Sequence, residues 1–97
     1  MSDVDDVKRR AFFTLNQMLK QVDTLATRDK KIACASSIFA FIASEGRFML
    51  ADVKLYSTVQ AKLREFYTDN DWHAAANYWH VLFPGVPFEP EIERAQA

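Results

Sequence analysis

The chain has 97 residues, of which 12 are lysine or arginine and 13 are aspartate or glutamate, so its formal net charge is −1. This length fits one domain of common size, and a nearly neutral chain has no overall field that would attract a nucleic-acid backbone. The hydrophobic fraction of 49% is ample for a packed core, which argues against disorder over most of the chain.

Residues that break helices are almost absent until the C-terminal region. Gly46 is the only glycine in the first 83 residues, and no proline occurs there. An internal proline costs a helix about 3 kcal/mol and a glycine about 1 kcal/mol, so a stretch without them can stay helical. The sequence therefore predicts an all-α, small four-helix bundle-like domain over residues 1–83. A Pro-rich extended C-terminal strap or tail is expected over residues 84–97.

The first predicted helix covers residues 3–27. Apolar side chains recur in it at steps of three and four residues, as in a helix with one buried stripe. The stripe contains Val4, Ala11, Leu15, Met18, Val22 and Leu25, with Phe12, Leu19 and Ala26 beside it. A stripe of this kind must face a neighbouring element, because an isolated helix gains little stability from propensity alone.

The second predicted helix runs from Lys30 to about Glu45, with Asp29 as its expected N-cap. Its apolar run, Ile32 to Ala43, is shorter than the roughly 20 residues that a membrane span needs, so we expect a central core helix. Gly46 is expected to end this helix in the left-handed conformation.

The third predicted helix is well defined in its middle, and the sequence allows two positions for its first residue. Asp52 is a candidate N-cap, and residues 48–50 fit either a turn or the first helical residues. The polar run from Thr68 to Asp71 predicts a turn that carries cap candidates for a fourth helix, Trp72 to Phe83.

The fourth predicted helix has an unusually small polar surface. Trp72, Ala76, Trp79 and Phe83 share one face of a helical wheel, and His73, Asn77 and His80 form one narrow polar strip. The opposite side, Ala74, Tyr78 and Val81, is apolar or nearly so. Such a helix is either packed on two sides within its own bundle or covered by a partner.

The hypothesis we carry forward is a non-enzymatic protein-binding module that acts through the fourth helix and the strap. Buried aromatic anchors dominate interface energies. The candidate partner-binding residues are therefore Trp72, Tyr78, Trp79, Val81 and Phe88. An adaptor, a chaperone-like protein or an inhibitor of a larger protein machine would fit, and a homodimer is the simplest variant. Alternatively, Val86 and Phe88 only cover the end of the bundle.

A second hypothesis is a DNA-binding regulator. The segment from Ser57 to Leu63 is similar to the recognition helix of helix-turn-helix regulators. This resemblance implies DNA contacts from Ser57, Thr58, Lys62 and Arg64.

The sequence offers no pattern for a metal, a cofactor or a catalytic group. His73 and His80 are seven residues apart, a helical rise of about 10.5 Å, which is too far for both to bind one metal ion directly. The single cysteine, Cys34, cannot form an intrachain disulfide, and the acidic first six residues do not resemble a secretory signal. We therefore expect a cytoplasmic protein with no membrane partner.

Overall fold

The computed structural model describes residues 3–97 and the surroundings of the side chains from residue 6 onward. The elements are α1 Asp3–Gln21, η1 Val22–Thr24, α2 Arg28–Ser44, η2 Arg47–Ala51, α3 Val53–Asp69, α4 Ala74–Leu82 and α5 Glu89–Gln96, where η marks a 3-10 helix. No strand occurs in this part of the chain, so the expected all-helical class is confirmed. The helices form two compact units, Met1–Ile38 and Phe39–Ala97.

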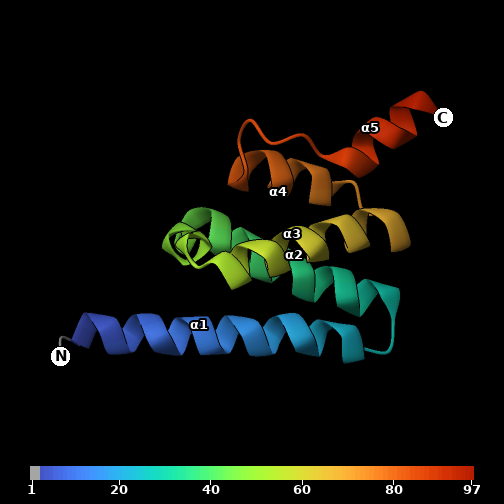
Figure 1. The fold of residues 1–97 in the computed structure, drawn as a ribbon. Helices are drawn as coiled ribbons and strands as arrows, with labels where there is room; N and C mark the ends of the chain where they lie inside the picture. Colours follow the sequence, from blue (N-terminus) through green and yellow to red (C-terminus); the bar gives the residue numbers. More distant parts are fainter. Residues whose placement is uncertain (1–2) are drawn as a thin grey trace. The chain divides into compact units, whose positions relative to one another are not determined.

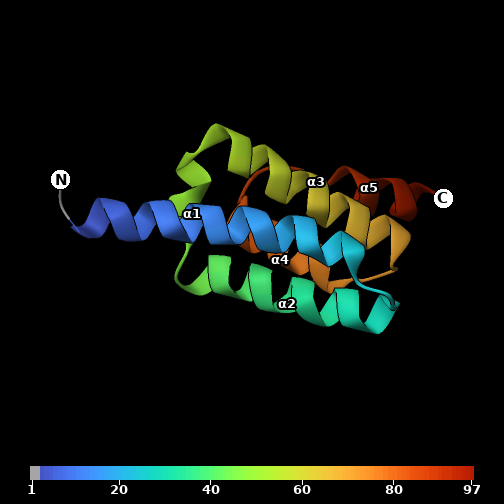
Figure 2. The same ribbon diagram turned by 90° about the horizontal axis from the view of Figure 1, so that it is seen from below.

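The first unit contains α1, η1 and most of α2. Helix α1 ends at Gln21, earlier than the predicted Thr27, because the Thr24 hydroxyl donates to the Gln21 carbonyl (2.7 Å) and Leu25 is extended. The chain then reverses direction into α2 (Figure 2). Leu15, Leu19 and Val22 are buried, as the apolar stripe predicts.

The capping residue predicted for α2 was wrong. Helix α2 begins at Arg28, and its cap is Thr27, whose hydroxyl oxygen accepts a hydrogen bond from the Lys30 amide at 3.2 Å. Asp29 instead lies in the first turn, where its charge still suits the helix dipole.

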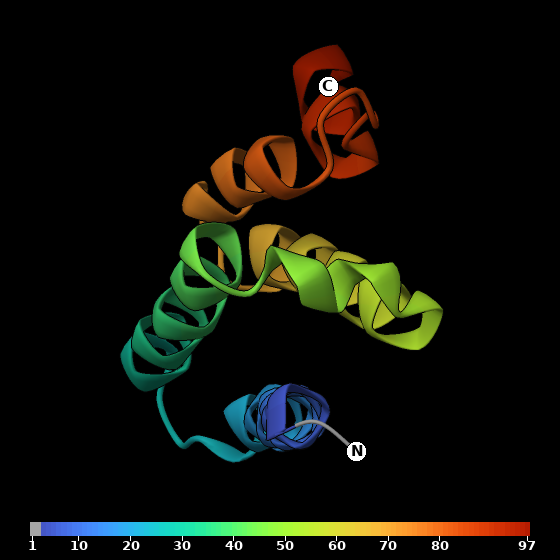
Figure 3. The same cartoon turned by 90° about the vertical axis from the view of Figure 1, so that its left-hand side faces the viewer.

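Gly46 ends α2 for a different reason than expected. Its φ of −108° is not left-handed. A Cβ at this position would lie 2.9 Å from Met49 Cε and 3.2 Å from Ile42 Cα, so a larger residue would press on the end of the Met49 side chain and on the α2 backbone. The chain continues into η2, which connects α2 to α3 (Figure 3).

The second unit is built around α3, along which α4 packs (Figure 1). Asp52 caps α3 as predicted, since its carboxylate accepts from the Leu55 amide at 2.9 Å. The buried side chains of this unit come from every one of its segments except α5: Phe39, Ile42, Met49, Leu55, Val59, Leu63, Phe66, Tyr67, Ala75, Ala76, Trp79, Leu82, Phe83 and Phe88.

Helix α4 is shorter than predicted. It begins at Ala74, and Trp72 lies before it, because the chain turns at Asp71 with a φ of 50°. That left-handed conformation is uncommon outside glycine, although aspartate tolerates it better than most residues.

The C-terminal segment is not the extended strap that was expected. Only residues 83–88 are non-helical, and Glu89–Gln96 forms α5. Pro90 is compatible with this helix because the first turn needs no amide donor from it, and Glu89 and Glu91 favour the N-terminal end of the dipole. Gly85 supplies the turn before α5, with a φ of 83°.

None of the helices in residues 3–97 combines the length and the apolar character that crossing a membrane demands.

Candidate functional site

Trp79 lies on the inner side of α4 and is completely buried. Its indole Nε1 donates to the Val86 carbonyl at 2.8 Å, and the Arg64 guanidinium stacks over the ring at 4.8 Å. The indole therefore joins α3, α4 and the segment that follows α4. Because its surface and its polar atom are both used within the unit, Trp79 is a core residue in the isolated chain.

Phe88 is buried beside Trp79. The two rings are 4.8 Å apart, and Phe88 also meets Tyr67 at 5.1 Å in an edge-to-face contact. Together with the Val86 carbonyl, Phe88 fastens the segment after α4 to the helices. This geometry matches the alternative in which Val86 and Phe88 cover the end of the bundle.

Trp72 and Tyr78 form the edge of a second aromatic cluster. Both rings lie about 6 Å from Phe39, at 6.1 and 6.0 Å, and they are 5.9 Å from each other. Phe39 is buried, whereas Trp72 and Tyr78 are half-buried. Each of them thus covers the core with one side and reaches solvent with the other.

The outward side of α4 has no aspartate, glutamate, lysine or arginine. It consists of Ala74, Asn77, Tyr78 and Val81, which we call the outer face of α4. Val81 is 45% exposed, and the aromatic edge of Tyr78 borders it at the three-residue helical spacing. Of the five predicted partner-binding residues, the structure places Tyr78 and Val81 on this face and Trp72 next to its start.

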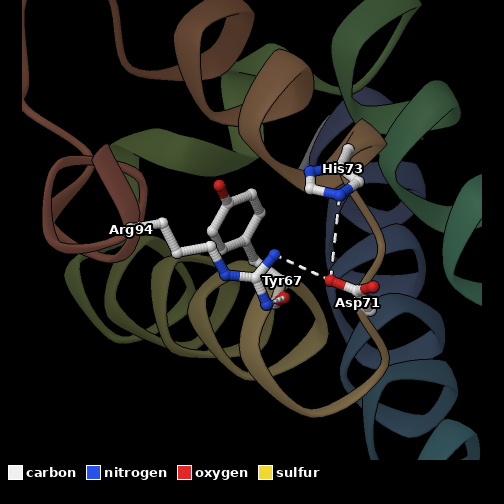
Figure 4. Close-up of polar contacts among 4 residues, drawn as sticks. All are labelled: Tyr67, Asp71, His73 and Arg94. Carbon is white, nitrogen blue, oxygen red and sulfur yellow. Dashed lines mark hydrogen bonds and ion pairs between the residues drawn. The ribbon is translucent and has the colours of Figure 1, made fainter. Parts of the chain in front are cut away.

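A polar clamp holds α5 against the end of α3 (Figure 4). Arg94 forms an ion pair with Asp71 at 2.7 Å and donates to the Tyr67 carbonyl at 3.0 Å, while its guanidinium lies 4.4 Å from the centre of the Tyr67 ring. His73 approaches the same Asp71 oxygen at 3.7 Å. Asp71, at the centre of these contacts, is the residue with the left-handed φ of 50°.

The second histidine contacts α5 as well. His80 Nε2 lies 3.0 Å from the Glu91 carboxylate, and both side chains are about half exposed. Each histidine therefore has a carboxylate neighbour on the surface, and the His80–Glu91 pair connects α4 to α5. Within the described residues, no group of three or more potential ligands is arranged to hold a metal ion.

The four residues of the DNA hypothesis all lie on α3, and they differ in their exposure and in their intramolecular contacts. Ser57 is exposed, and the Thr58 hydroxyl donates to the Lys54 carbonyl at 2.8 Å. Lys62 is half-buried, 3.7 Å from Glu65. Arg64 is stacked on Trp79 with its Nε buried and without a hydrogen-bond partner among the described residues.

Six exposed large apolar residues of the described chain were not among the candidates: Val7, Phe13, Phe41, Phe48, Val53 and Ile92. Phe13 is 67% exposed on α1, and Ile92 is 44% exposed on α5. Phe13 falls outside the apolar stripe of α1, and that position was the available signal. Ile92 could not be identified as an exposed helical residue, because its segment was expected to be extended.

No protein-family model matches this chain, and neither a curated protein nor a solved structure matches it.

Proposed function

We propose that this protein is a non-enzymatic protein-binding module whose contact surface is the outer face of α4. An adaptor, a chaperone-like protein and an inhibitor of a larger protein machine are the types of protein that fit. The observation that supports the proposal most directly is Val81, a large apolar side chain that is 45% exposed on a helix without aspartate, glutamate, lysine or arginine.

The aromatic residues beside Val81 support the same proposal. Tyr78 and Trp72 are anchored on Phe39, so few rotamers remain to be fixed when a partner covers their exposed edges. Tyrosine and tryptophan are also among the residues that contribute most at interfaces. Trp79 and Phe88 support the surface from inside, as the core on which α4 rests.

The side chains on which the protein-binding and DNA-binding hypotheses depend differ in their intramolecular contacts. Lys62 and Arg64 have intramolecular neighbours, Glu65 and Trp79, and they would have to leave them to bind phosphate. No comparable rearrangement is needed at Val81. We therefore propose protein binding alone.

The test is a quantitative affinity purification with three forms of the full chain: wild type, Val81→Asp and Val53→Asp. Val53 is a matched control, because it is an 81% exposed valine in the same compact unit, at the start of α3. We expect Val81→Asp to lose its bound protein, since a carboxylate would be buried without a partner in the interface, and Val53→Asp to keep it. Equal retention by both variants would refute the proposal.

A further inference from the structure

Helix α1 carries an exposed phenylalanine with two arginines beside it. Phe13 is 67% exposed and lies away from the buried stripe of its helix. Arg9 and Arg10 precede it by four and three residues, so they lie on the same side of the helix, and together with Thr14 they line a shallow depression around its ring. Lys20 is exposed two turns further on. Asp6 is exposed on the same side, seven residues before Phe13, so this side of the helix carries three cations and one carboxylate. We call Arg9, Arg10, Phe13 and Lys20 the basic face of α1.

Helix α5 carries the opposite arrangement. Ile92 is 44% exposed, Glu89 precedes it by three residues, and Glu93 follows it; both glutamates are exposed. The charges on the inward side of this helix are already engaged, because Arg94 contacts Asp71 and Glu91 contacts His80. We call Glu89, Ile92 and Glu93 the acidic face of α5.

The two faces are complementary in charge and similar in pattern. An arginine stands three residues before Phe13, and a glutamate stands three residues before Ile92. When helices pack with these apolar residues in contact, the cations of one face meet the carboxylates of the other. A large apolar side chain surrounded by charge gains most from a partner that removes the ring from water and also neutralises its rim.

We infer that a second copy of this chain binds here, with the basic face of α1 in one copy on the acidic face of α5 in the next. This surface is distinct from the outer face of α4. The contact is heterologous, because two different faces meet, so a pair joined by one contact keeps one unused α1 face on one copy and one unused α5 face on the other unless a ring closes. Association should therefore give either a closed ring, of which a reciprocal dimer is the smallest, or a longer chain of copies.

The interface is small, since α5 has 8 residues and is about 12 Å long. Contacts of this size are weak and transient, and charges at an exposed rim are screened by salt. We expect the average mass of the wild type to rise between about 10 μM and about 1 mM protein at low ionic strength. In about 0.5 M salt the association should weaken by roughly tenfold.

Charge reversal provides the decisive test, by sedimentation velocity. The variant Arg9→Glu/Arg10→Glu and the variant Glu89→Lys/Glu93→Lys should each remain monomeric, because each has two faces of the same sign. Mixed in equal amounts they should associate again, since the acidic α1 of the first then meets the basic α5 of the second. Phe13→Ser, which changes no charge, should also weaken the association.

The control is Lys30→Glu/Lys54→Glu, which changes the net charge by the same amount as the arginine variant at two exposed lysines outside both faces. It should associate like the wild type, and circular dichroism should show equal helix content in all variants. A wild type that stays monomeric up to about 1 mM at low salt would overturn the inference. So would a mixture of the two reversed variants that stays monomeric, or a wild type that binds anionic vesicles without self-association.

Discussion

The two glycines of this chain are restricted for different physical reasons. Substitutions at the two positions should distinguish a packing restriction from a backbone restriction. Gly46 has an ordinary φ in a crowded place. Gly85 has a left-handed φ of 83°, and a Cβ added there would meet no atom within 4 Å. The restriction is thus packing at the first position and backbone conformation at the second.

We predict that Gly46→Ala lowers the free energy of unfolding by about 1–3 kcal/mol, because Met49 and the α2 backbone must move to accept the methyl group. Gly85→Ala should cost about 1–2 kcal/mol through its φ alone. Gly85→Asn should recover part of that loss, since asparagine tolerates the left-handed region, whereas Gly46→Asn should be worse than Gly46→Ala. Urea denaturation of the four variants measures these differences.

Trp79 combines apolar burial with one buried donor, and the two contributions can be separated. Trp79→Phe removes the hydrogen bond to the Val86 carbonyl and leaves part of the indole volume empty, so we predict a loss of about 2–4 kcal/mol of unfolding free energy. Phe88→Leu, which removes ring area without deleting a donor, is the comparison and should cost less. Equal stability of Trp79→Phe and wild type would contradict the proposed role of the indole.

At the scale of the elements, the position of a helix cap can be tested directly. Thr27→Ala should destabilise the protein by about 1 kcal/mol, because the Lys30 amide loses its acceptor. Asp29→Ala should change stability by only a few tenths of a kcal/mol, since Asp29 acts through the helix dipole alone. Thermal unfolding of the two variants distinguishes the two cap assignments. A larger loss of Tm in Asp29→Ala than in Thr27→Ala would contradict the structure.

Helix α5 is held in part by the polar clamp at Arg94. We predict that Arg94→Ala increases amide hydrogen exchange in residues 89–96 while exchange in α3 changes little, because the substitution removes the contacts to Asp71 and Tyr67. Arg94→Lys should give an intermediate result, since lysine keeps the charge and lacks the planar fork. The stability effect should be small, about 0.5–1 kcal/mol, because both charged groups are largely exposed.

Periodic elements were predictable from the sequence, and their ends were less so. The apolar stripe of α1 is long, and Asp52 stands directly before α3, so local chemistry determines these features. The end of α1 involves the Thr24 hydroxyl, which donates to the Gln21 carbonyl. The cap of α2 is the Thr27 hydroxyl, an acceptor with which the nearby Asp29 carboxylate competes in a sequence-based prediction. Helix α5 was missed because Pro84, Pro87 and Pro90 indicate an extended chain, whereas a proline in the first turn is harmless.

The candidate site was only partly predictable for a related reason. A helical wheel places Ala76, Trp79 and Phe83 on one face of α4, and the structure buries all three within the unit, including Trp79, which was predicted to contact a partner. It cannot show that Phe39 lies under Tyr78, because that contact joins residues far apart in the sequence. Nor does it show that the segment after α4 folds back to bury Phe88.

At the scale of the whole molecule, the proposals assign different tasks to different surfaces. The outer face of α4 is uncharged and is proposed to bind another protein, whereas the charged faces of α1 and α5 are proposed to join copies of this chain. The two contacts should respond differently to salt, because screening weakens charge pairs much more than apolar contacts. Partner binding should therefore persist in about 0.5 M salt, at which self-association is strongly weakened.

The proposed binding role of the outer face of α4 is tested most directly by site-specific photo-crosslinking inside the cells that produce the protein. A photoreactive phenylalanine analogue replaces Val81 in one form of the protein and Val53 in another; both sites are exposed valines of the same compact unit. We predict that position 81 yields a crosslink to one defined partner protein and that position 53 does not. The same products from both positions, or none from position 81, would contradict a binding role for this face.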